Sequence, residues 1–172
     1  IGEHLKHSFS KEIHNLLSDY EYEIREIERD RLDDFMTRRD FCAINVTIPY
    51  KEAVIPYLAY ISEEAKAIGA VNTIVNRNGK LYGYNTDFYG MSELIKRIGI
   101  DLRNKKVVIL GTGGTSKTSL AVAKLLGARE IIRVSRSARE NAVTYEELYE
   151  NHADTDVIIN TTPSGMYPNI FD

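Results

Sequence analysis

The glycine-rich segment Gly111–Thr115 constrains the fold of this chain more than any other feature. It follows a short apolar run, Lys106–Leu110, and precedes a helical pattern over Ser116–Leu126 that Gly127 ends. Glycines in such a turn let backbone N–H groups approach a pyrophosphate, and the positive end of the helix dipole favours the anion. The spacing predicts a dinucleotide-binding unit built on a parallel sheet. A tight turn without a ligand is the alternative, because such turns also need glycine for steric reasons. The residues expected at the cofactor are Gly111, Thr112, Gly113, Gly114 and Thr115.

The end of the next predicted strand, Glu130–Ser135, bears on the choice between NAD and NADP. An NAD site commonly places an acidic residue ~20 residues after the glycines, where it holds the ribose 2′-hydroxyl. This chain has Ser135, Arg136 and Ser137 there, with Arg139 nearby. An arginine flanked by hydroxyls can bind a 2′-phosphate and stack on adenine, so NADP is the predicted cofactor. The alternative is that Arg136 is a solvated loop residue.

Composition excludes several classes of protein. The 172 residues allow one large domain or two small ones, and the net charge of −3 argues against binding nucleic acid by phosphate neutralisation. No apolar run approaches the ~18 residues of a membrane span. The single cysteine, Cys42, excludes an intramolecular disulfide framework and a cysteine-based zinc site. The four histidines show no metal-ligand spacing, so no metal is expected, and no secretory signal is visible, so we expect a cytoplasmic protein.

The first half of the chain alternates helical and strand patterns, which predicts a mostly parallel sheet. A helix capped by Ser10 is expected to bury Ile13, Leu16, Leu17 and Tyr20. The other expected elements are an edge strand over residues 22–26, a helix opened by Asp30 with Leu32, Phe35 and Met36, a buried strand over Phe41–Val46, and a helix from Pro49 through Ile55.

A hairpin interrupts this alternation. Asn78 and Gly79, the pair typical of a tight type I′ turn, lie between the strand patterns Val71–Val75 and Lys80–Tyr84. The remaining expected elements are a helix from Ser62 to Gly69, a helix over Phe88–Ile98, a linker over Ile100–Lys106, a helix over Tyr145–Tyr149 and a strand over Asp156–Asn160.

Polar side chains gather in three places of the first half. Ser8 and Ser10 are separated by one residue, Thr47 and Lys51 follow the strand Phe41–Val46, and Asn72 and Asp87 lie at the two ends of the hairpin. Each also has a structural explanation: Ser10, Thr47 and Asp87 are good helix caps, Asn72 suits a turn, and Lys51 suits a solvated first turn.

Six segments together resemble the shikimate dehydrogenase family, in which 3-dehydroshikimate and shikimate are interconverted with NADP. They occur in that family's order and spacing: His7–Ser10, Asn45–Lys51, Gly69–Thr73, Gly83–Asp87, Gly111–Thr115 and Asn160–Met166. The resemblance implies an α/β protein of two domains with a cleft between them: a substrate domain over residues 1–97 and a Rossmann-like NADP domain over residues 98–172. It also implies that the chain lacks a C-terminal part of that second domain.

The resemblance also assigns roles to residues. Ser8 and Ser10 would bind the substrate carboxylate, Thr47 and Asn72 would face the ring hydroxyls, and Lys51 with Asp87 would form the catalytic pair. Thr161 and Met166 would border the nicotinamide. An ammonium can stabilise a developing alkoxide and donate the proton that ketone reduction requires. Whether Lys51 is the acid–base itself or mainly a positioning charge stays open.

Two rival functions remain at this level. A quinate or quinate/shikimate dehydrogenase would admit one more ring hydroxyl, and a non-catalytic binding fragment would keep the fold without turnover. Ser8, Ser10 and Thr47 favour shikimate, and Arg136 favours NADP. The expected partners are a small-molecule substrate and the cofactor, with neither nucleic acid nor membrane, and the sequence leaves monomer and homodimer open.

Overall fold

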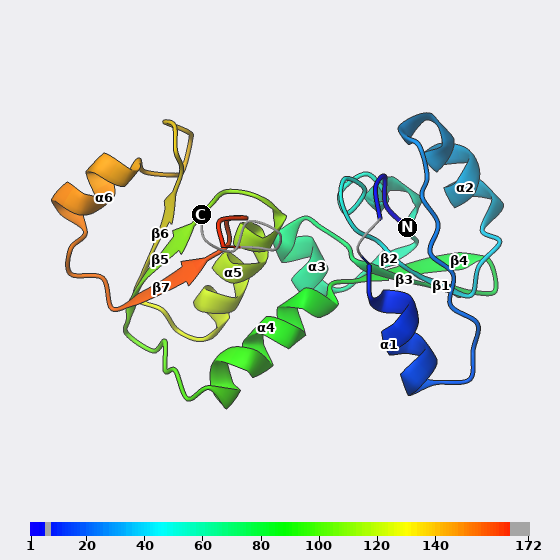
Figure 1. Ribbon diagram of the computed structural model, residues 1–172, viewed down its shortest axis with the longest axis horizontal. Coiled ribbons are helices and arrows are strands. Elements are labelled where there is room, and N and C mark those ends of the chain that lie inside the picture. The colour runs from blue at the N-terminus through cyan, green and yellow to red at the C-terminus, as the bar shows by residue number, and fades with distance from the viewer. Residues whose placement is uncertain (6–7, 166–172) are drawn as a thin grey trace. The chain divides into compact units, whose positions relative to one another are not determined.

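The computed structural model of the chain describes residues 1–5 and 8–165, and the molecule divides into two compact units (Figure 1). Unit 1 is Ile1–Thr86 and unit 2 is Asp87–Asp172. None of the helices in the described ranges has the length and apolar character needed to cross a membrane. The predicted assignment of residues 1–97 to a substrate domain stays a prediction, because compactness does not report ligand binding.

Unit 1 contains a four-stranded sheet in the order β1 (Ala43–Asn45), β3 (Thr73–Arg77), β4 (Lys80–Tyr84) and β2 (Tyr60–Ile61). The α/β class is confirmed. The prediction of a mostly parallel sheet is wrong in detail, since β1–β3 and β3–β4 are antiparallel and only β2–β4 is parallel among these strands. The hairpin at Asn78 and Gly79, whose φ values of 53° and 78° fit the predicted type I′ turn, reverses the chain and makes β3 and β4 antiparallel.

The helices of unit 1 are short: α1 (Ser10–Leu17), the 3-10 turn Arg29–Arg31, α2 (Leu32–Arg38), the 3-10 turn Ile55–Tyr57 and α3 (Glu63–Ile68). The prediction for α3 is confirmed, and that for α2 holds except at its start, because Asp30 lies in the preceding 3-10 turn and α2 begins at Leu32. Leu32 and Met36 are buried on α2, the Ser62 hydroxyl accepts a hydrogen bond from the amide of Ala65, and Gly69 ends α3 with φ 71°.

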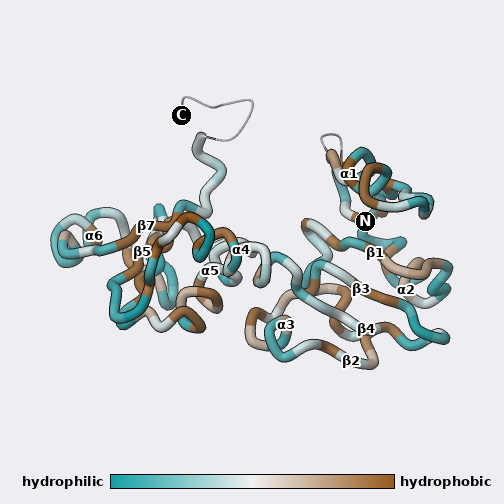
Figure 2. Tube along the Cα trace, turned by 90° about the horizontal axis from the view of Figure 1, so that it is seen from below, coloured by the Kyte–Doolittle hydropathy of each residue, from teal (hydrophilic) through white to brown (hydrophobic). Residues whose placement is uncertain are grey.

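The predicted buried face of α1 is wrong. Ile13, Leu16, Leu17 and Tyr20 are 52%, 87%, 75% and 52% exposed, and Figure 2 shows hydrophobic residues along this helix. Ser10 is the first helical residue and not the cap, which is Phe9. Periodicity marks an apolar face on a helix, but it does not specify an element that covers that face.

Two predicted strands are shorter than expected. Residues 21–25 have no regular secondary structure, and only Glu26 of this segment forms a bridge, with Gly2. The strand predicted over Phe41–Val46 is observed only as β1. Ala43 is exposed because β1 lies at the edge of the sheet. Val46, just beyond β1, is buried.

The predicted helix from Pro49 through Ile55 is also wrong. These residues form consecutive turns, with a cis peptide bond before Pro49 and a 3-10 turn that has Pro56 in its first turn. Val54 donates to the Tyr50 carbonyl in an α-type bond, whereas Ile55 donates to Glu52 in a tighter one. Pro56 has no N–H with which to continue the helix.

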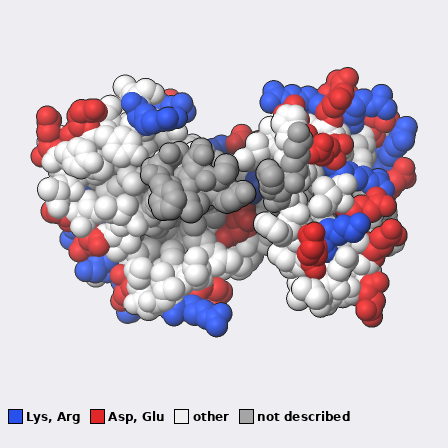
Figure 3. Space-filling model, in the orientation of Figure 1, with Lys and Arg blue, Asp and Glu red and all other residues white. Residues whose placement is uncertain are grey.

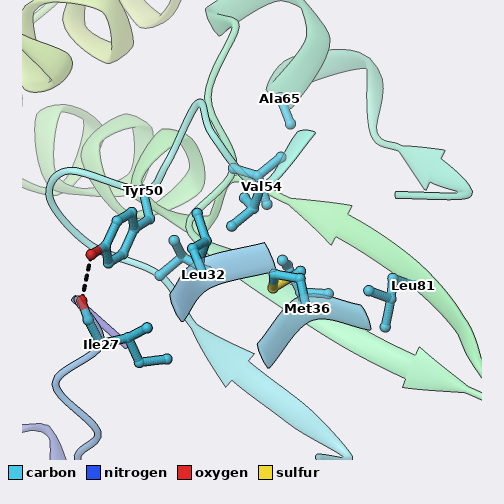
Figure 4. Packing of buried hydrophobic residues seen from close by; sticks show 10 residues of the cluster. Ile27, Leu32, Met36, Tyr50, Val54, Ala65 and Leu81 are labelled. Carbon is cyan, nitrogen blue, oxygen red and sulfur yellow. Dashed lines mark hydrogen bonds between the residues drawn. The ribbon is translucent and has the colours of Figure 1, made fainter. Parts of the chain in front are cut away.

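The core of unit 1 joins these irregular segments to the sheet (Figure 4). Met36 of α2 and Val54 of the turn segment are fully buried, together with Ile74 of β3 and Leu81 of β4. The Tyr50 hydroxyl donates to the Ile27 carbonyl, and burial raises the pKa of this phenol. Tyr50 is therefore a packing residue that fixes the start of the turn segment.

Unit 2 contains the parallel sheet that the glycine pattern predicts. β5 (Lys106–Leu110) lies between β6 (Glu130–Val134) and β7 (Val157–Asn160), and both pairings are parallel (Figure 1). The helices are α4 (Thr86–Arg97), α5 (Gly114–Leu125) and α6 (Tyr145–Asn151). Val108, Ile132 and Val134 pack on one face of the sheet against Tyr145 and Leu148.

Charged side chains join the amino ends of β5 and β7. Lys106 is 4% exposed, and its ammonium lies 2.6 Å from the Asp154 carboxylate. Its backbone N–H donates to Asp156 at 2.8 Å, and Lys105 pairs with the same carboxylate at 3.2 Å. Hydrogen bonds from Lys106 lower the pKa values of Asp154 and Asp156, and the bond to Asp154 raises the pKa of Lys106.

Candidate functional site

The first group of predicted site residues surrounds Asn72, which is 8% exposed at the start of β3. Its side-chain oxygen accepts hydrogen bonds from the Thr86 backbone N–H at 2.8 Å, the Thr73 hydroxyl at 3.0 Å and the Thr86 hydroxyl at 3.2 Å. The backbone N–H can only donate, so it fixes which side-chain atom is oxygen. Asn72 thus caps the first turn of α4 from a remote strand, and its Nδ2 group is the part that can donate to a ligand.

Asn85 and Thr86 support this arrangement. Asn85 is 1% exposed and its amide donates to the Ala70 carbonyl at 3.0 Å, which fixes the chain between β4 and α4. Asp87 follows in the first turn of α4, where a carboxylate interacts favourably with the helix dipole. The Asp87 side chain is exposed.

Thr47 and Lys51 follow β1 on the turn segment. Thr47 is exposed, its backbone N–H donates to the Ile1 carbonyl, and its own carbonyl accepts from Tyr50. Lys51 is half-buried, and its carbonyl accepts from the N–H of Val71, the residue before Asn72. This backbone bond places Lys51 beside the start of β3.

Ser8 and Ser10 form a compact turn at the start of α1. The Ser10 backbone N–H donates to the Ser8 hydroxyl oxygen at 3.3 Å, and both side chains are half-buried. Because the Ser8 oxygen accepts this bond, its own O–H remains a donor. The expectation that these residues lie in an extended segment is wrong, since Ser10 is already helical. His7 lies outside the described residues.

The second group is the glycine turn of unit 2. Gly111 has φ 105°, and a Cβ atom there would lie 2.8 Å from the Thr161 hydroxyl. Gly113 is the N-cap of α5 and no side chain caps its amides, while a Cβ on Gly113 or Gly114 would meet nothing within 4 Å. The first turn of α5 therefore presents backbone donors beside open space, which suits an anionic group.

Thr161 lies against this turn. Its hydroxyl and its backbone N–H both bond to the Leu110 carbonyl, at 2.6 and 2.9 Å. The loop that continues to Gly165 thus starts at the carboxyl ends of β5 and β7, where ligands of open parallel sheets bind. Met166 lies outside the described residues.

The two arginines after β6, Arg136 and Arg139, differ in their contacts. Arg136 and Ser137 are exposed, and Ser135 is buried with its hydroxyl oxygen accepting from the Ser137 N–H at 3.4 Å. Arg139 is the residue that reaches the glycine turn, with its guanidinium 3.4 Å from the Thr112 hydroxyl. From the sequence, Arg139 is predicted only to lie near Arg136.

These residues fit a phosphorylated dinucleotide. The uncapped amides of α5, the glycine positions without side chains and the arginines after β6 provide donors for a pyrophosphate and for a 2′-phosphate. The acidic side chain that would repel a 2′-phosphate is absent from Ser135–Ser137. Within the described ranges, no group of three or more His, Cys, Asp or Glu side chains could hold a metal ion.

The predicted site residues do not include Thr73 and Thr86, which hold Asn72. Both are adjacent to predicted site residues, so the adjacency to Asn72 and Asp87 was the available signal. The contact itself depends on the register of β3 with β4, in which Thr73 lies opposite Tyr84.

Comparison with known proteins agrees with these observations. Residues 1–74 match the family model described as the shikimate dehydrogenase substrate binding domain. A relative named shikimate dehydrogenase (NADP(+)) from Clostridium beijerinckii is 41% identical over all of this chain, which spans 69% of that relative.

Solved structures are similar over nearly the same extent. Shikimate dehydrogenase 1 from Peptoclostridium difficile is 40% identical with a TM-score of 0.84, over 98% of this chain and 67% of that one. The Thermus thermophilus shikimate 5-dehydrogenase, solved in complex with NADP(H) and shikimate, is 28% identical with a TM-score of 0.81, over 95% of this chain and 67% of that one. With its glycine turn and its ordered polar segments, the chain belongs to the NADP-dependent shikimate dehydrogenase family.

Proposed function

We propose that this chain catalyses the reversible reduction of 3-dehydroshikimate to shikimate with NADPH, a step of the shikimate pathway to aromatic amino acids. The observation that carries the proposal is the 41% identity, over the whole chain, to a relative named for this reaction. The proposed compartment is the cytoplasm, where the exposed thiol of Cys42 would stay reduced.

The proposed substrate is a cyclic carboxylic acid with several ring hydroxyls, and the polar groups of unit 1 suit it. Ser8 and Ser10 would donate their O–H groups to the carboxylate. Thr47 and the Nδ2 group of Asn72 would bind ring hydroxyls. The fixed orientation of Asn72 supports this role, because an amide held by three hydrogen bonds donates in one direction only.

Lys51 and Asp87 would carry out the proton transfer. Reduction adds a hydride to the carbonyl carbon and a proton to its oxygen, and NADPH supplies the hydride. The Lys51 ammonium would donate the proton to the developing alkoxide and recover it in the reverse direction. The Asp87 carboxylate would orient the lysine.

The cofactor would be held by unit 2. The backbone amides of Gly113, Gly114 and Thr115 would bind the pyrophosphate, and Gly111 keeps the turn close to Thr161. Arg136 and Arg139, with Ser135 and Ser137, would surround the 2′-phosphate. Thr112 holds Arg139 toward the turn.

A matched pair of lysine variants tests the proposed site. Lys51→Ala should lower shikimate-dependent NADP reduction by about 10²-fold or more, in the range seen when a proton-transfer group is removed. Lys80→Ala, at the hairpin, should leave the rate unchanged. Near-normal activity of Lys51→Ala would remove Lys51 from the mechanism.

The variant Lys51→Arg separates the two roles of Lys51. If Lys51 is the acid–base, Lys51→Arg should lose the rate, because arginine does not release its proton. If it is a positioning charge, Lys51→Arg should keep most of the rate.

A further inference from the structure

The helix α1 carries the proposed carboxylate-binding turn, yet it buries little of its own surface. Ser8 and Ser10 lie at its start, and none of the residues of α1 is buried. Leu16 and Leu17, at its other end, are exposed. Packing of an apolar face ordinarily holds a helix in place. The position of α1 therefore depends on the polar contacts that its side chains make with the sheet.

His14 makes such a contact. Its ring is half-buried, and Nε2 lies 3.2 Å from the side-chain nitrogen of Asn45 in β1. The ring also stacks on Tyr22, with the two centroids 4.1 Å apart and the planes inclined by 15°, and Nδ1 contacts the Tyr20 hydroxyl. His14 thus joins α1 both to β1 and to the segment that follows the helix.

The hydrogen-bonding groups of His14 and Asn45 are complementary. Nδ2 of Asn45 lies 3.1 Å from the Tyr22 hydroxyl oxygen and 3.2 Å from Nε2 of His14, and an amide nitrogen carries one hydrogen for each. With this orientation of the amide, the neutral imidazole accepts at Nε2 and donates from Nδ1 to the Tyr20 oxygen. One arrangement of hydrogens therefore satisfies both ring nitrogens.

Asn45 is fixed relative to the residues that are proposed to bind the ring hydroxyls. Thr47 follows it by two residues, and between them the Val46 N–H donates to the Asn72 carbonyl at 2.8 Å. In the register of β1 with β3, Asn45 lies opposite Thr73, the residue after Asn72. The separation of Asn45 from Thr47 and from Asn72 is therefore set by the sheet.

The spacing along α1 connects His14 to the two serines. Ser10 and His14 are four residues apart in one helix, so their side chains lie on the same face, one turn apart. The bond of His14 to Asn45 thus determines where Ser10 lies relative to the sheet. Ser8 follows, because its hydroxyl oxygen accepts a hydrogen bond from the Ser10 N–H at 3.3 Å.

We propose that His14 is a positioning residue: its bond to Asn45 holds the two serines of the carboxylate-binding turn at a fixed separation from the groups that bind the ring hydroxyls. This role rests on the proposed function, because it concerns affinity for the proposed substrate. A ligand that contacts both groups at once binds more tightly when their separation is fixed beforehand, because less freedom is lost on binding. Lys51 and Asp87 lie on other segments, so His14 affects substrate binding and not the chemical step.

Two variants of His14 test this role by titration calorimetry with shikimate. His14→Phe keeps a ring to stack on Tyr22 but removes both nitrogens, and it should raise the Kd for shikimate about two- to tenfold. His14→Gln supplies an amide that can bond to Asn45 and should restore most of the affinity. In both variants, the Kd for NADP and the kcat of shikimate-dependent NADP reduction should stay within about twofold of the parent values.

A double-mutant cycle tests the partner. Asn45→Ala should raise the Kd for shikimate by a similar factor, and adding it to His14→Phe should raise the Kd little further, because both changes remove the same contact. Lys11→Gln, at an exposed position of the same helix, is the matched control and should bind shikimate as the parent chain does.

Amide hydrogen exchange tests the anchoring of α1 without substrate. His14→Phe should speed the exchange of α1 amides and leave that of β5 unchanged, whereas Lys11→Gln should change neither. Thermal unfolding confirms that each variant folds, and if His14→Phe does not, Asn45→Ala decides.

The outcomes separate this role from the proposed function. Equal shikimate affinity of the parent chain, His14→Phe and Asn45→Ala overturns the role of His14 and leaves the proposed function standing. A loss of NADP affinity as large as that for shikimate would indicate a general structural effect and would also overturn it. Absence of shikimate binding by the parent chain contradicts the proposed function and, with it, this role.

Discussion

Hydrogen bonds from Thr73 and Thr86 orient the side chain of Asn72, so removing one of them should weaken the proposed binding of substrate by Asn72. Thr73→Val removes the hydroxyl that donates to the Asn72 oxygen at 3.0 Å and keeps the shape of the side chain. We expect the Kd for shikimate to rise about two- to tenfold, as for the loss of one net hydrogen bond.

Thr73→Ser supplies the matched control, because it restores the hydroxyl and should restore the affinity. Titration calorimetry measures both variants, and the NMR signal of the Asn72 side-chain amide should shift in the valine variant only. Unchanged shikimate affinity in Thr73→Val would show that Thr86 alone holds Asn72.

Gly111 and Gly113 should respond differently to alanine. At Gly111, φ is 105° and a Cβ would lie 2.8 Å from Thr161, so Gly111→Ala should lower the free energy of unfolding by about 1–3 kcal/mol and weaken NADP binding. At Gly113 the backbone is extended, with φ −77°, and the space is open. Gly113→Ala should therefore change the free energy of unfolding by less than about 0.5 kcal/mol. Urea unfolding measures both, and equal losses would contradict this account of the turn.

Replacing Ser116 by alanine is expected to stabilise the folded chain. Its hydroxyl is buried without a hydrogen-bond partner among the described residues, and a buried unsatisfied hydroxyl costs about 1–3 kcal/mol. Ser116→Ala should raise the free energy of unfolding, while Ser164→Ala, on an exposed loop, should leave it unchanged. A lower stability of Ser116→Ala in urea unfolding would indicate a hydrogen bond to water or ligand.

The residue types of the site could be predicted from the sequence, but their partners could not. Thr161 and the glycine turn follow strands whose order fixes their proximity. In contrast, the bond from Thr86 to Asn72 depends on hairpin register, and the reach of Arg139 to Thr112 depends on the path of the chain after β6. Neither is encoded in local spacing.

At the scale of elements, prediction succeeded where short-range signals are complete. β5 matches its predicted bounds because an apolar run ends in a glycine turn, and the hairpin forms because Asn78 and Gly79 both adopt positive φ. It failed at Pro49 and α1. The segment from Pro49 through Ile55, followed by Pro56, forms hydrogen-bonded turns in place of a helix. The burial of the apolar face of α1 depends on a covering element that periodicity does not identify.

The acidic groups at the amino ends of β5 and β7 predict a pH dependence of stability. The pKa values of Asp154 and Asp156 are lowered from 3.8 in the folded chain, so their stabilisation is complete above this value and is lost as the pH falls through the lower folded pKa. The raised pKa of Lys106 has the opposite consequence, with stabilisation lost at alkaline pH above 10.5.

Asp154→Asn should therefore be less stable than the parent chain at neutral pH and should lose less stability on acidification. Urea unfolding at a series of pH values measures this. Glu93→Gln, which removes an exposed pair with Lys96, is the matched control and should change the free energy of unfolding by less than about 1 kcal/mol. Parallel pH curves for Asp154→Asn and the parent chain would contradict the assigned role.

At the scale of the whole molecule, the chain joins a unit with a mixed sheet to a unit with a parallel sheet, and each carries its own part of the proposed chemistry. Charges of both signs are interspersed on the face of the molecule that Figure 3 shows, as the net charge of −3 suggests. We propose that selectivity for an anionic substrate and cofactor comes from local groups such as Ser8, Asn72 and the first turn of α5.

The most direct test of the central claim compares kcat/KM for four pairings of substrate and cofactor: shikimate or quinate with NADP or NAD, followed by the absorbance of the reduced nicotinamide. The account predicts that shikimate with NADP gives the highest value, and the preference for NADP follows from the proposal that Arg136 and Arg139 hold the 2′-phosphate, with no acidic residue among Ser135–Ser137 to repel it. A preference for quinate with NAD, or no reduction with any pairing, would contradict it.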